Sequence, residues 1–419
     1  MRLAVVALCS AVVAGALTAA VPGAGTVARP EPPTRAGAAP DRYHPPGRAV
    51  AARTDSVVVP TYDPAVTLAR AAKPLRRFTV VMAGDVLLHN TLWAQAQRDA
   101  RAAGRSGYDF RPLLAGVRPT VSGADLAICH LETPLGPSQG PFTSYPIFSV
   151  PPRIAKDLAW AGYDACTTAS NHTLDRGVPG VHRTLASLDA AGIAHAGSAR
   201  TVREAGRIRL LDAAGAKVAL LSYTYGLNGF LRPADRPWIV DLIDAGDIRA
   251  DAARARRAGA DVVLVALHWG NEYQSQPTEV QRELAATLLG SPDIDLVYGH
   301  HAHVVQPFER VRGKWIAYGL GNHVAEQTVV EEATHEGVMA RFTFAMTAAG
   351  RWRVTGAEYL PTAVSRSQPY RLVDLTRALT SGRLPDARRS AYLRAYRHVA
   401  AAVNSLGARQ DGLLPADLS

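Results

Sequence analysis

The feature that most constrains the fold is a pattern that recurs four times between residues 122 and 303. A small residue or a proline is followed by an aspartate, then by a predicted strand, which in several cases is a continuous apolar run, and then by histidine. Uninterrupted apolar runs of this kind are typical of strands buried on both faces between helices. The pattern therefore predicts an α/β domain whose strands end in imidazole side chains: His130, His172, His268 and the group His300, His301 and His303.

The stretches between these runs have the periodicity of helices, so strands and helices alternate along the chain. The predicted strands cover Phe78–Ala83, Asp125–Cys129, Asp164–Ala169, Val218–Tyr223, Asp261–Leu267, Asp295–Tyr298 and Trp315–Tyr318. The predicted helices cover Thr91–Ala103, Arg153–Ala161, Val181–Ala191, Ile248–Ala258 and Thr278–Leu289. A hairpin of Met339–Thr347 and Arg351–Glu358 is expected to close the domain.

The N-terminus reads as an export signal followed by a tether. A short cationic start precedes an apolar stretch and small residues, so residues 1–27 are predicted to be a secretory signal or, since the stretch is almost long enough to span a bilayer, an uncleaved membrane anchor. Residues 28–75, rich in Pro, Ala and Arg, are expected to form a disordered linker. The domain is expected to cover residues 76–363, and residues 364–419 a helical C-terminal appendage. Either reading of the N-terminus predicts an exported protein, extracellular or associated with the cell envelope.

The distribution of charge and the number of cysteines argue against two classes of protein, those that bind nucleic acids and those held together by many disulfides. The net charge is +10, but the cations are mostly arginines scattered without a basic stripe interleaved with aromatic residues, which argues against nucleic-acid binding. Three cysteines cannot form a disulfide framework. Cys9 lies in the apolar leader, and Cys129 and Cys166 are expected to be buried small hydrophobic residues.

Two carboxylates follow the first two predicted strands, Asp85 and Glu132. Ligands in α/β sheets bind at the carboxyl ends of strands, so these acids are expected to meet the histidines there. Imidazole nitrogens and carboxylate oxygens are ligands of Zn, Mn and Fe, and two such cations can share a carboxylate. The expected ligand set is Asp85, Glu132, Asn171, His268, His301 and His303, with His172 close by.

Three residues near the expected ligands, His300, Asp175 and His89, each have two alternative roles. In extended backbone His301 and His303 would project to one side and His300 to the other, so His300 is expected to support the ligands or to play no part. Asp175 could orient His172 by accepting an imidazole N–H, or could cap a helix or turn. His89 could reach the cations from a helix start, or could face solvent.

Several segments resemble the CapA family, named for poly-gamma-glutamate capsule synthesis, and through it the calcineurin-like metallophosphoesterases. The matching pieces run in family order over about residues 78 to 361: MAGDVLL, ADLAICHLETPLG, AGYDACTTASNHTLDRG, SYTYGLNG, DVVLVALHWGNEY, DLVYGHHAHVVQPFE and YGLGN. The resemblance implies a four-layer α/β/β/α sandwich with the metal site at the strand C-terminal ends. It assigns the family's metal-site residues to Asp85, Glu132, Asn171, His172, His268, His301 and His303.

Two positions depart from the family pattern. His130 stands where the family usually has Asn, and it could add a ligand, add a proton donor, or have no effect on the site. His323 stands where the family usually has Phe, so Asn322 and His323 imitate an Asn-His motif in the wrong order; Asn322 could line the pocket.

The resemblance implies a dinuclear metal-dependent hydrolase of phosphate esters or related anionic substrates. In that reading two divalent transition-metal ions would activate water, and His172, aligned by Asp175, would protonate the leaving oxygen. The mouth is expected to be lined by the loop Gly136–Pro152 together with Tyr225, Asn228, Trp269 and Glu272. The alternative is a non-catalytic protein that uses its metal site to hold an anionic surface polymer.

Overall fold

The structure is a computed structural model that describes residues 76–327, 332–382 and 384–416. The predicted signal or anchor (1–27) and linker (28–75) lie outside the described residues. Within the described part of the chain, no helix combines the length and apolar character needed to cross a membrane.

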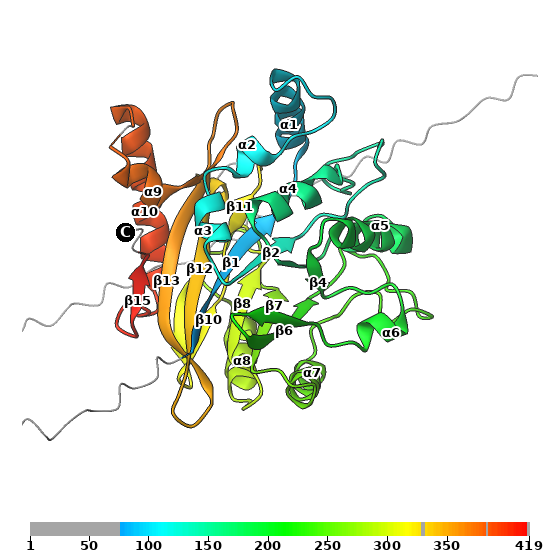
Figure 1. The fold of residues 1–419 in the computed structure, drawn as a ribbon, viewed down its shortest axis with the longest axis vertical. Helices are drawn as coiled ribbons and strands as arrows, with labels where there is room; N and C mark the ends of the chain where they lie inside the picture. Colours follow the sequence, from blue (N-terminus) through cyan, green and yellow to red (C-terminus); the bar gives the residue numbers. More distant parts are fainter. Residues whose placement is uncertain (1–75, 328–331, 383, 417–419) are drawn as a thin grey trace, which may run out of the picture. The chain divides into compact units, whose positions relative to one another are not determined.

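Two sheets form the centre of the domain (Figure 1). The nine-stranded sheet contains β1 (Arg77–Val86), β2 (Leu126–Leu131), β3 (Ala165–Thr167), β4 (Ala194–Ala196), β11 (Asn322–Val324), β12 (Glu336–Met346), β13 (Trp352–Val364), β14 (Leu372–Asp374) and β15 (Leu413–Pro415). The six-stranded sheet contains β5 (Leu210–Ala213), β6 (Ala216–Thr224), β7 (Val262–His268), β8 (Leu296–His300), β9 (Phe308–Val311) and β10 (Lys314–Ala317). Their orders are β14-β13-β12-β1-β2-β3-β4 and β5-β6-β7-β8-β10-β9, with β11 beside β1 and β15 beside β13.

Helices cover the outer face of each sheet. They are α1 (Asn90–Ala102), α2 (Arg111–Leu114), α3 (Arg118–Ser122), α4 (Arg153–Ala161) and α5 (Gly177–Ala190) on the nine-stranded sheet, and α7 (Ala245–Arg257) and α8 (Glu279–Leu289) on the six-stranded sheet. The short α6 (Val202–Ala205) follows β4. The predicted four-layer α/β/β/α sandwich is therefore confirmed.

Alternation of side chains along β1 shows how the layers are held together. Val81 and Ala83 point into the core beneath the helices, whereas Val80 and Met82 point into the core between the sheets. Leu264 of β7 reaches the inter-sheet core from the other side. Because successive strand residues face opposite sides, a continuous apolar run fills both cores.

Each predicted strand, helix and hairpin strand corresponds to an observed element, and α4 has the predicted limits. Helix α8 begins after Thr278, whose hydroxyl accepts from the Gln281 N–H in a reciprocal capping box. The elements that were not predicted are mostly short, such as β4 and β9. A three- or four-residue strand carries too little periodicity to be recognised.

Residues 364–416 differ from the expected appendage. They contain α9 (Leu375–Thr380) and α10 (Asp386–Asn404), but also β14 and β15, which pair with β13 on the nine-stranded sheet. Val399 and Val403 of α10 are buried in the inter-sheet core. This segment is therefore built into the domain.

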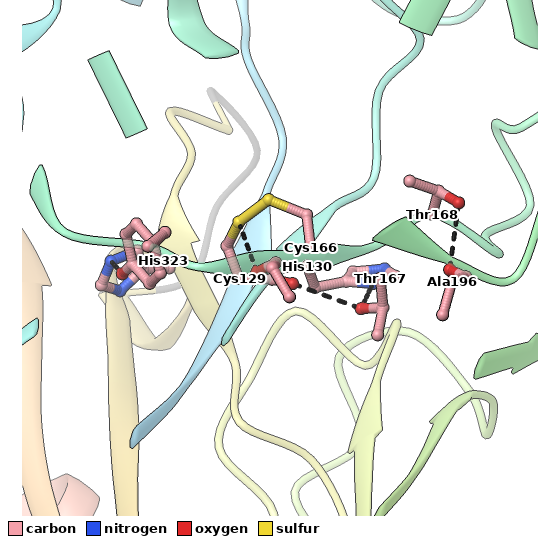
Figure 2. Close-up of a disulfide and its surroundings, with 9 residues drawn as sticks. Cys129, His130, Cys166, Thr167, Thr168, Ala196 and His323 are labelled. Atoms are coloured by element: carbon pink, nitrogen blue, oxygen red, sulfur yellow. Dashed lines mark hydrogen bonds between the residues drawn. A yellow bond between two sulfur atoms is a disulfide. The ribbon is translucent and has the colours of Figure 1, made fainter. Parts of the chain in front are cut away.

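Cys129 and Cys166 form a disulfide between β2 and β3 (Figure 2). The prediction of two unpaired cysteines was wrong, although both are buried as expected. The two residues are direct neighbours in the parallel register, with Cα atoms 4.5 Å apart. Strand pairing therefore brings together two cysteines that are 37 positions apart in the sequence.

Removal of this disulfide should lower the free energy of unfolding by about 4 kcal/mol, since the bond closes a loop of 37 residues in the unfolded chain. Urea unfolding of the oxidised protein, of the reduced protein and of Cys129→Ala measures the change. The reduced protein and the variant should lose similar amounts. Equal stability of the oxidised and reduced proteins would contradict the prediction.

A cavity of about 900 Å³ lies between the ends of β4 and β6, beside α6 and α7. Asp241 lines it, on a segment that joins the two sheets: its N–H donates to the Gly197 carbonyl and its carbonyl accepts from the Thr224 N–H. Burial, reinforced by the nearby charge of Asp251, raises the pKa of the Asp241 carboxyl to about 7.

Asp241 should make stability depend on pH. Its carboxyl binds a proton more tightly in the folded protein than in the unfolded chain, so its contribution is fully present below about pH 4 and is lost as pH rises to about 7. Asp241→Asn should flatten this part of the profile, measured as the free energy of unfolding between pH 4 and 8. Glu283→Gln, at an exposed position on α8, is the control and should leave the slope unchanged.

Candidate metal centre

Buried side chains at the C-terminal ends of four strands, two from each sheet, lie close together. Asp85 lies near the end of β1, Glu132 directly follows β2, and His268 and His300 end β7 and β8. His300 Nδ1 is 2.8 Å from Asp85 Oδ1, and His268 Nε2 is 3.9 Å from Glu132 Oε1. Within these four residues, the nine-stranded sheet supplies the carboxylates and the six-stranded sheet the imidazoles.

His301 and His303 reach this group by a different backbone path from the predicted one. The expectation of extended backbone was wrong: both residues have positive φ, 89° and 56°, on a bend after β8. His303 nevertheless places Nδ1 3.3 Å from Asp85 Oδ2 and Nε2 3.8 Å from Glu132 Oε1. Left-handed backbone at non-glycine residues costs about 1–3 kcal/mol each and is concentrated at functional sites.

Glu132 carries the clearest indication that the site suits a cation. It is 1% exposed, and within the described chain neither carboxylate oxygen accepts a hydrogen bond. Burial raises the pKa of Glu132 well above its ordinary value, although the nearby His303 opposes this shift. A buried carboxylate is stable only when it is paired, hydrogen-bonded or bound to a metal.

Among the residues that the structure describes, three groups of potential metal ligands have their ligand atoms within 4.8 Å of one another. They are Asp85, Glu132 and His303; Glu272, His301 and His303; and Asp85, His130 and His300. The first two share His303 and mix carboxylate oxygen with imidazole nitrogen, the donor set that suits Zn, Mn or Fe. The residues present therefore fit a divalent transition-metal site.

The charges of the site are strongly coupled. Burial would raise the pKa of Asp85, but hydrogen bonds from His300 and His303 outweigh it and hold that pKa well below its usual value. Burial would likewise lower the pKa of His303, but Glu132 and Asp85 raise it to about 9. A proton on His303 thus balances part of the negative charge in the cation-free protein.

His172 and Asp175 form the hydrogen bond considered from the sequence. Asp175 Oδ2 accepts from His172 Nδ1 at 2.8 Å and from the Phe148 N–H at 2.7 Å. The alternative of a helix cap finds no support, since the N-cap of α5 is Arg176 and it has no side-chain capping bond. Within residues 76–327, 332–382 and 384–416, the hydrogen bond of the His172 ring is made by Nδ1 and not by Nε2.

Asn171, Asn228 and Tyr225 lie against the imidazoles. Asn171 Oδ1 is 2.8 Å from His268 Nε2, and its amide donates to Asn228 Oδ1 at 3.1 Å. The Tyr225 ring lies 4.6 Å from that of His301 and is half exposed. Tyr225 and Asn228 are on the exposed side of this group, whereas Asn171 is buried.

The remaining predicted residues divide between rim and core. His89 precedes α1, and its Nδ1 accepts from the Glu326 N–H at 3.3 Å; burial lowers its pKa to about 4. Glu272 is exposed and belongs to one candidate cation group. Trp269 does not line the mouth: it is buried in the core beneath α7 and α8 and donates to the Tyr318 carbonyl, because strand β7 ends one residue before it.

Asn322 and His323 point in different directions. Asn322 Oδ1 is 3.0 Å from His303 Nδ1, so Asn322 contacts the site. His323 Nε2 is instead 2.6 Å from the Tyr163 hydroxyl. Parallel pairing of β11 with β1 aligns Asn322 with Asp85, which no local motif could predict.

Thr167 was not predicted to contact the site, and Phe148 was predicted only as part of the loop Gly136–Pro152. Thr167 Oγ1 is 2.8 Å from His130 Nδ1, and the Phe148 ring packs edge-on against His172 with centroids 4.8 Å apart. Thr167 lies on β3, and its contact with His130 depends on the pairing of β3 with β2, which places the two residues opposite each other.

Residues 79–327 match the model of the family described as bacterial capsule synthesis protein PGA_cap. The chain is 28% identical over 205 residues to the PGA biosynthesis protein CapA of Bacillus subtilis (strain 168), covering 48% of this chain and 52% of that protein. It is 31% identical over 174 residues to a probable polyglutamine synthesis accessory protein of Mycobacterium tuberculosis (strain ATCC 25618 / H37Rv), covering 38% and 44%. The chain spans about half the length of the curated relatives it matches.

Two solved structures are distantly similar. A calcineurin-like phosphoesterase from Bacillus subtilis has 16% identity and a TM-score of 0.40, with 69% of this chain and 91% of that chain covered. A putative 5'-nucleotidase from Staphylococcus aureus has 15% identity and a TM-score of 0.44, with 77% and 58% covered.

Glu132→Gln should stabilise the cation-free protein at pH 8 by about 1–3 kcal/mol, because it removes a buried charge that has no hydrogen bond. The same change should abolish the stabilisation by Zn²⁺, which for the wild type should reach about 2.7 kcal/mol at 100 times the dissociation constant. Urea unfolding with and without Zn²⁺ measures both effects, with Glu283→Gln as control. A cation-free wild type more stable than Glu132→Gln would show that the protein alone compensates the charge.

Proposed function

The chain belongs to the PGA_cap family of bacterial capsule synthesis proteins, and from that premise we propose that its domain is a metal-dependent hydrolase of a phosphate ester or a related anionic substrate at the cell envelope. The observation that carries the proposal is the buried Glu132 carboxylate, which has no hydrogen bond within the described chain and lies 3.8–3.9 Å from two imidazoles. In a purely structural core, a buried carboxylate without a hydrogen bond lowers stability, whereas in a cation site it supplies a ligand.

The residues that would hold two divalent transition-metal ions are Asp85, Glu132, Asn171, His268, His301 and His303. Bound cations would neutralise charge on the substrate's oxygens and lower the pKa of an attacking water. Zn, Mn and Fe all suit this donor set.

His172 is the candidate for proton transfer. Asp175 holds the Nδ1 proton of His172, so Nε2 is the atom that would exchange a proton with the leaving oxygen. His172 lies close enough to His301 to contribute to the lowered pKa of that ring, although burial is the main cause. Phe148 packs edge-on against His172, which restricts rotation of the imidazole.

Export and envelope association are part of the proposal. The family consists of capsule synthesis proteins, and disulfides such as Cys129–Cys166 persist in oxidising compartments outside the cytosol. In this proposal residues 1–27 direct export or anchor the chain to the membrane.

A second candidate is a non-catalytic protein that binds an anionic surface polymer. The printed description of the Mycobacterium tuberculosis relative, an accessory protein of polyglutamine synthesis, favours this candidate. Both candidates use the same site and differ in turnover.

Elemental analysis of the purified full chain, paired with a screen of aryl phosphomonoesters and diesters, tests the proposal. We expect about two transition-metal ions per chain and turnover that is lost on chelation. His268→Ala should lower the metal content, whereas His195→Ala, a buried histidine paired with Asp189, should not. Metal without turnover of any ester would favour the binding candidate, and equal metal loss in both variants would refute the assigned site.

A further inference from the structure

His130 lies behind one of the candidate ligands, on the side away from Glu132. Its Nε2 is 3.0 Å from His268 Nδ1, and its Nδ1 is 2.8 Å from Thr167 Oγ1. Thr167 Oγ1 in turn donates to the Cys129 carbonyl at 3.4 Å. Three side chains thus form a buried chain of hydrogen bonds that starts at His268 and ends on a backbone carbonyl, shown in part in Figure 2.

The chemistry of His268 determines the direction of this chain. A cation bound through Nε2 requires a lone pair on that atom, so the proton of the neutral ring must sit on Nδ1. His130 Nε2 is then the acceptor, and His130 donates through Nδ1 to Thr167. Thr167 donates to the Cys129 carbonyl, which can only accept, so every proton in the chain has a partner.

Packing and strand pairing restrict the position of the His130 ring. Its ring stacks on that of His300 with centroids 3.9 Å apart and planes at 13°. Pairing of β2 with β3 sets His130 opposite Thr167, and the disulfide joins the preceding pair, Cys129 and Cys166. Figure 2 shows this disulfide next to the His130–Thr167 hydrogen bond.

Resting on the metal centre proposed above, we propose that His130 is a positioning residue that accepts the Nδ1 proton of His268 and so aims His268 Nε2 at the cation. Asp85, His130 and His300 form one of the three candidate cation groups, but hydrogen bonds occupy both nitrogens of His130 and Nδ1 of His300. His130 therefore acts through His268 and binds no cation itself.

Two substitutions at position 130 separate this role from packing. His130→Phe keeps a ring of similar size but offers no acceptor, whereas His130→Gln supplies both an acceptor and a donor. We expect His130→Phe to weaken Zn²⁺ binding by about 10- to 100-fold and His130→Gln to restore most of the loss. Competition with a chromophoric chelator measures the affinity, and the absorption of the Co²⁺-substituted protein reports the geometry around the cation.

Two further variants keep the test valid if His130→Phe does not fold. Thr167→Val preserves shape but removes the acceptor for His130 Nδ1, and should weaken Zn²⁺ binding by a smaller factor than His130→Phe. Tyr163→Phe is the matched control: it also removes a buried hydroxyl bonded to a histidine, His323, and should leave Zn²⁺ affinity unchanged.

The outcomes are distinguishable. A wild type that binds no Zn²⁺ overturns the metal centre, and the role of His130 with it. A wild type that binds Zn²⁺ with the same affinity as His130→Phe and Thr167→Val overturns only the role of His130. Loss of one whole equivalent of Zn²⁺ in both His130→Phe and His130→Gln would make His130 a ligand and also overturn the positioning role.

Discussion

The site depends on one electrostatic constraint, the burial of the Glu132 carboxylate away from any hydrogen-bond donor of the described chain. Removing such a charge from water costs several kcal/mol unless an opposite charge lies beside it. His303, whose pKa is raised to about 9 chiefly by Glu132 and Asp85 against the effect of burial, supplies part of that charge. His303 follows β8 of the six-stranded sheet, whereas Glu132 follows β2 of the nine-stranded sheet. Contact between the sheets is therefore a condition of the site as well as of the fold.

The orientation of the imidazoles depends on their second nitrogens. Asn322 lies beside Nδ1 of His303, Asp175 accepts from Nδ1 of His172, and His130 lies beside Nδ1 of His268. In His268 and His303 the other nitrogen, Nε2, faces candidate ligands: it lies 2.8 Å from Asn171 Oδ1 in His268 and 3.8 Å from Glu132 Oε1 in His303. A ring fixed in this way loses little rotamer freedom on binding a ligand, which is the usual purpose of such supporting contacts in metal sites.

The sequence predicted the strand ends well and the contacts between them poorly. Glu132 and His268 could be placed because each directly follows or ends an apolar run, and such runs are local signals. The convergence of His301 and His303 was also foreseen, but from an extended backbone that the positive φ values exclude. The disulfide and the role of Asn322 depend on the pairing of β2 with β3 and of β1 with β11, which no local pattern specifies.

Short strands explain why the disulfide lies where it does. β3 has three residues, so few backbone hydrogen bonds fix its register against β2, and a shift by one position would turn Thr167 away from His130. The disulfide between Cys129 and Cys166 prevents such a shift, and it lies one residue before the contact between His130 and Thr167. In the cytosol this bond would be reduced, whereas in the oxidising environment of the proposed export route it persists. In the proposed function, the exported protein would therefore keep the bond that fixes the register of Thr167 against His130.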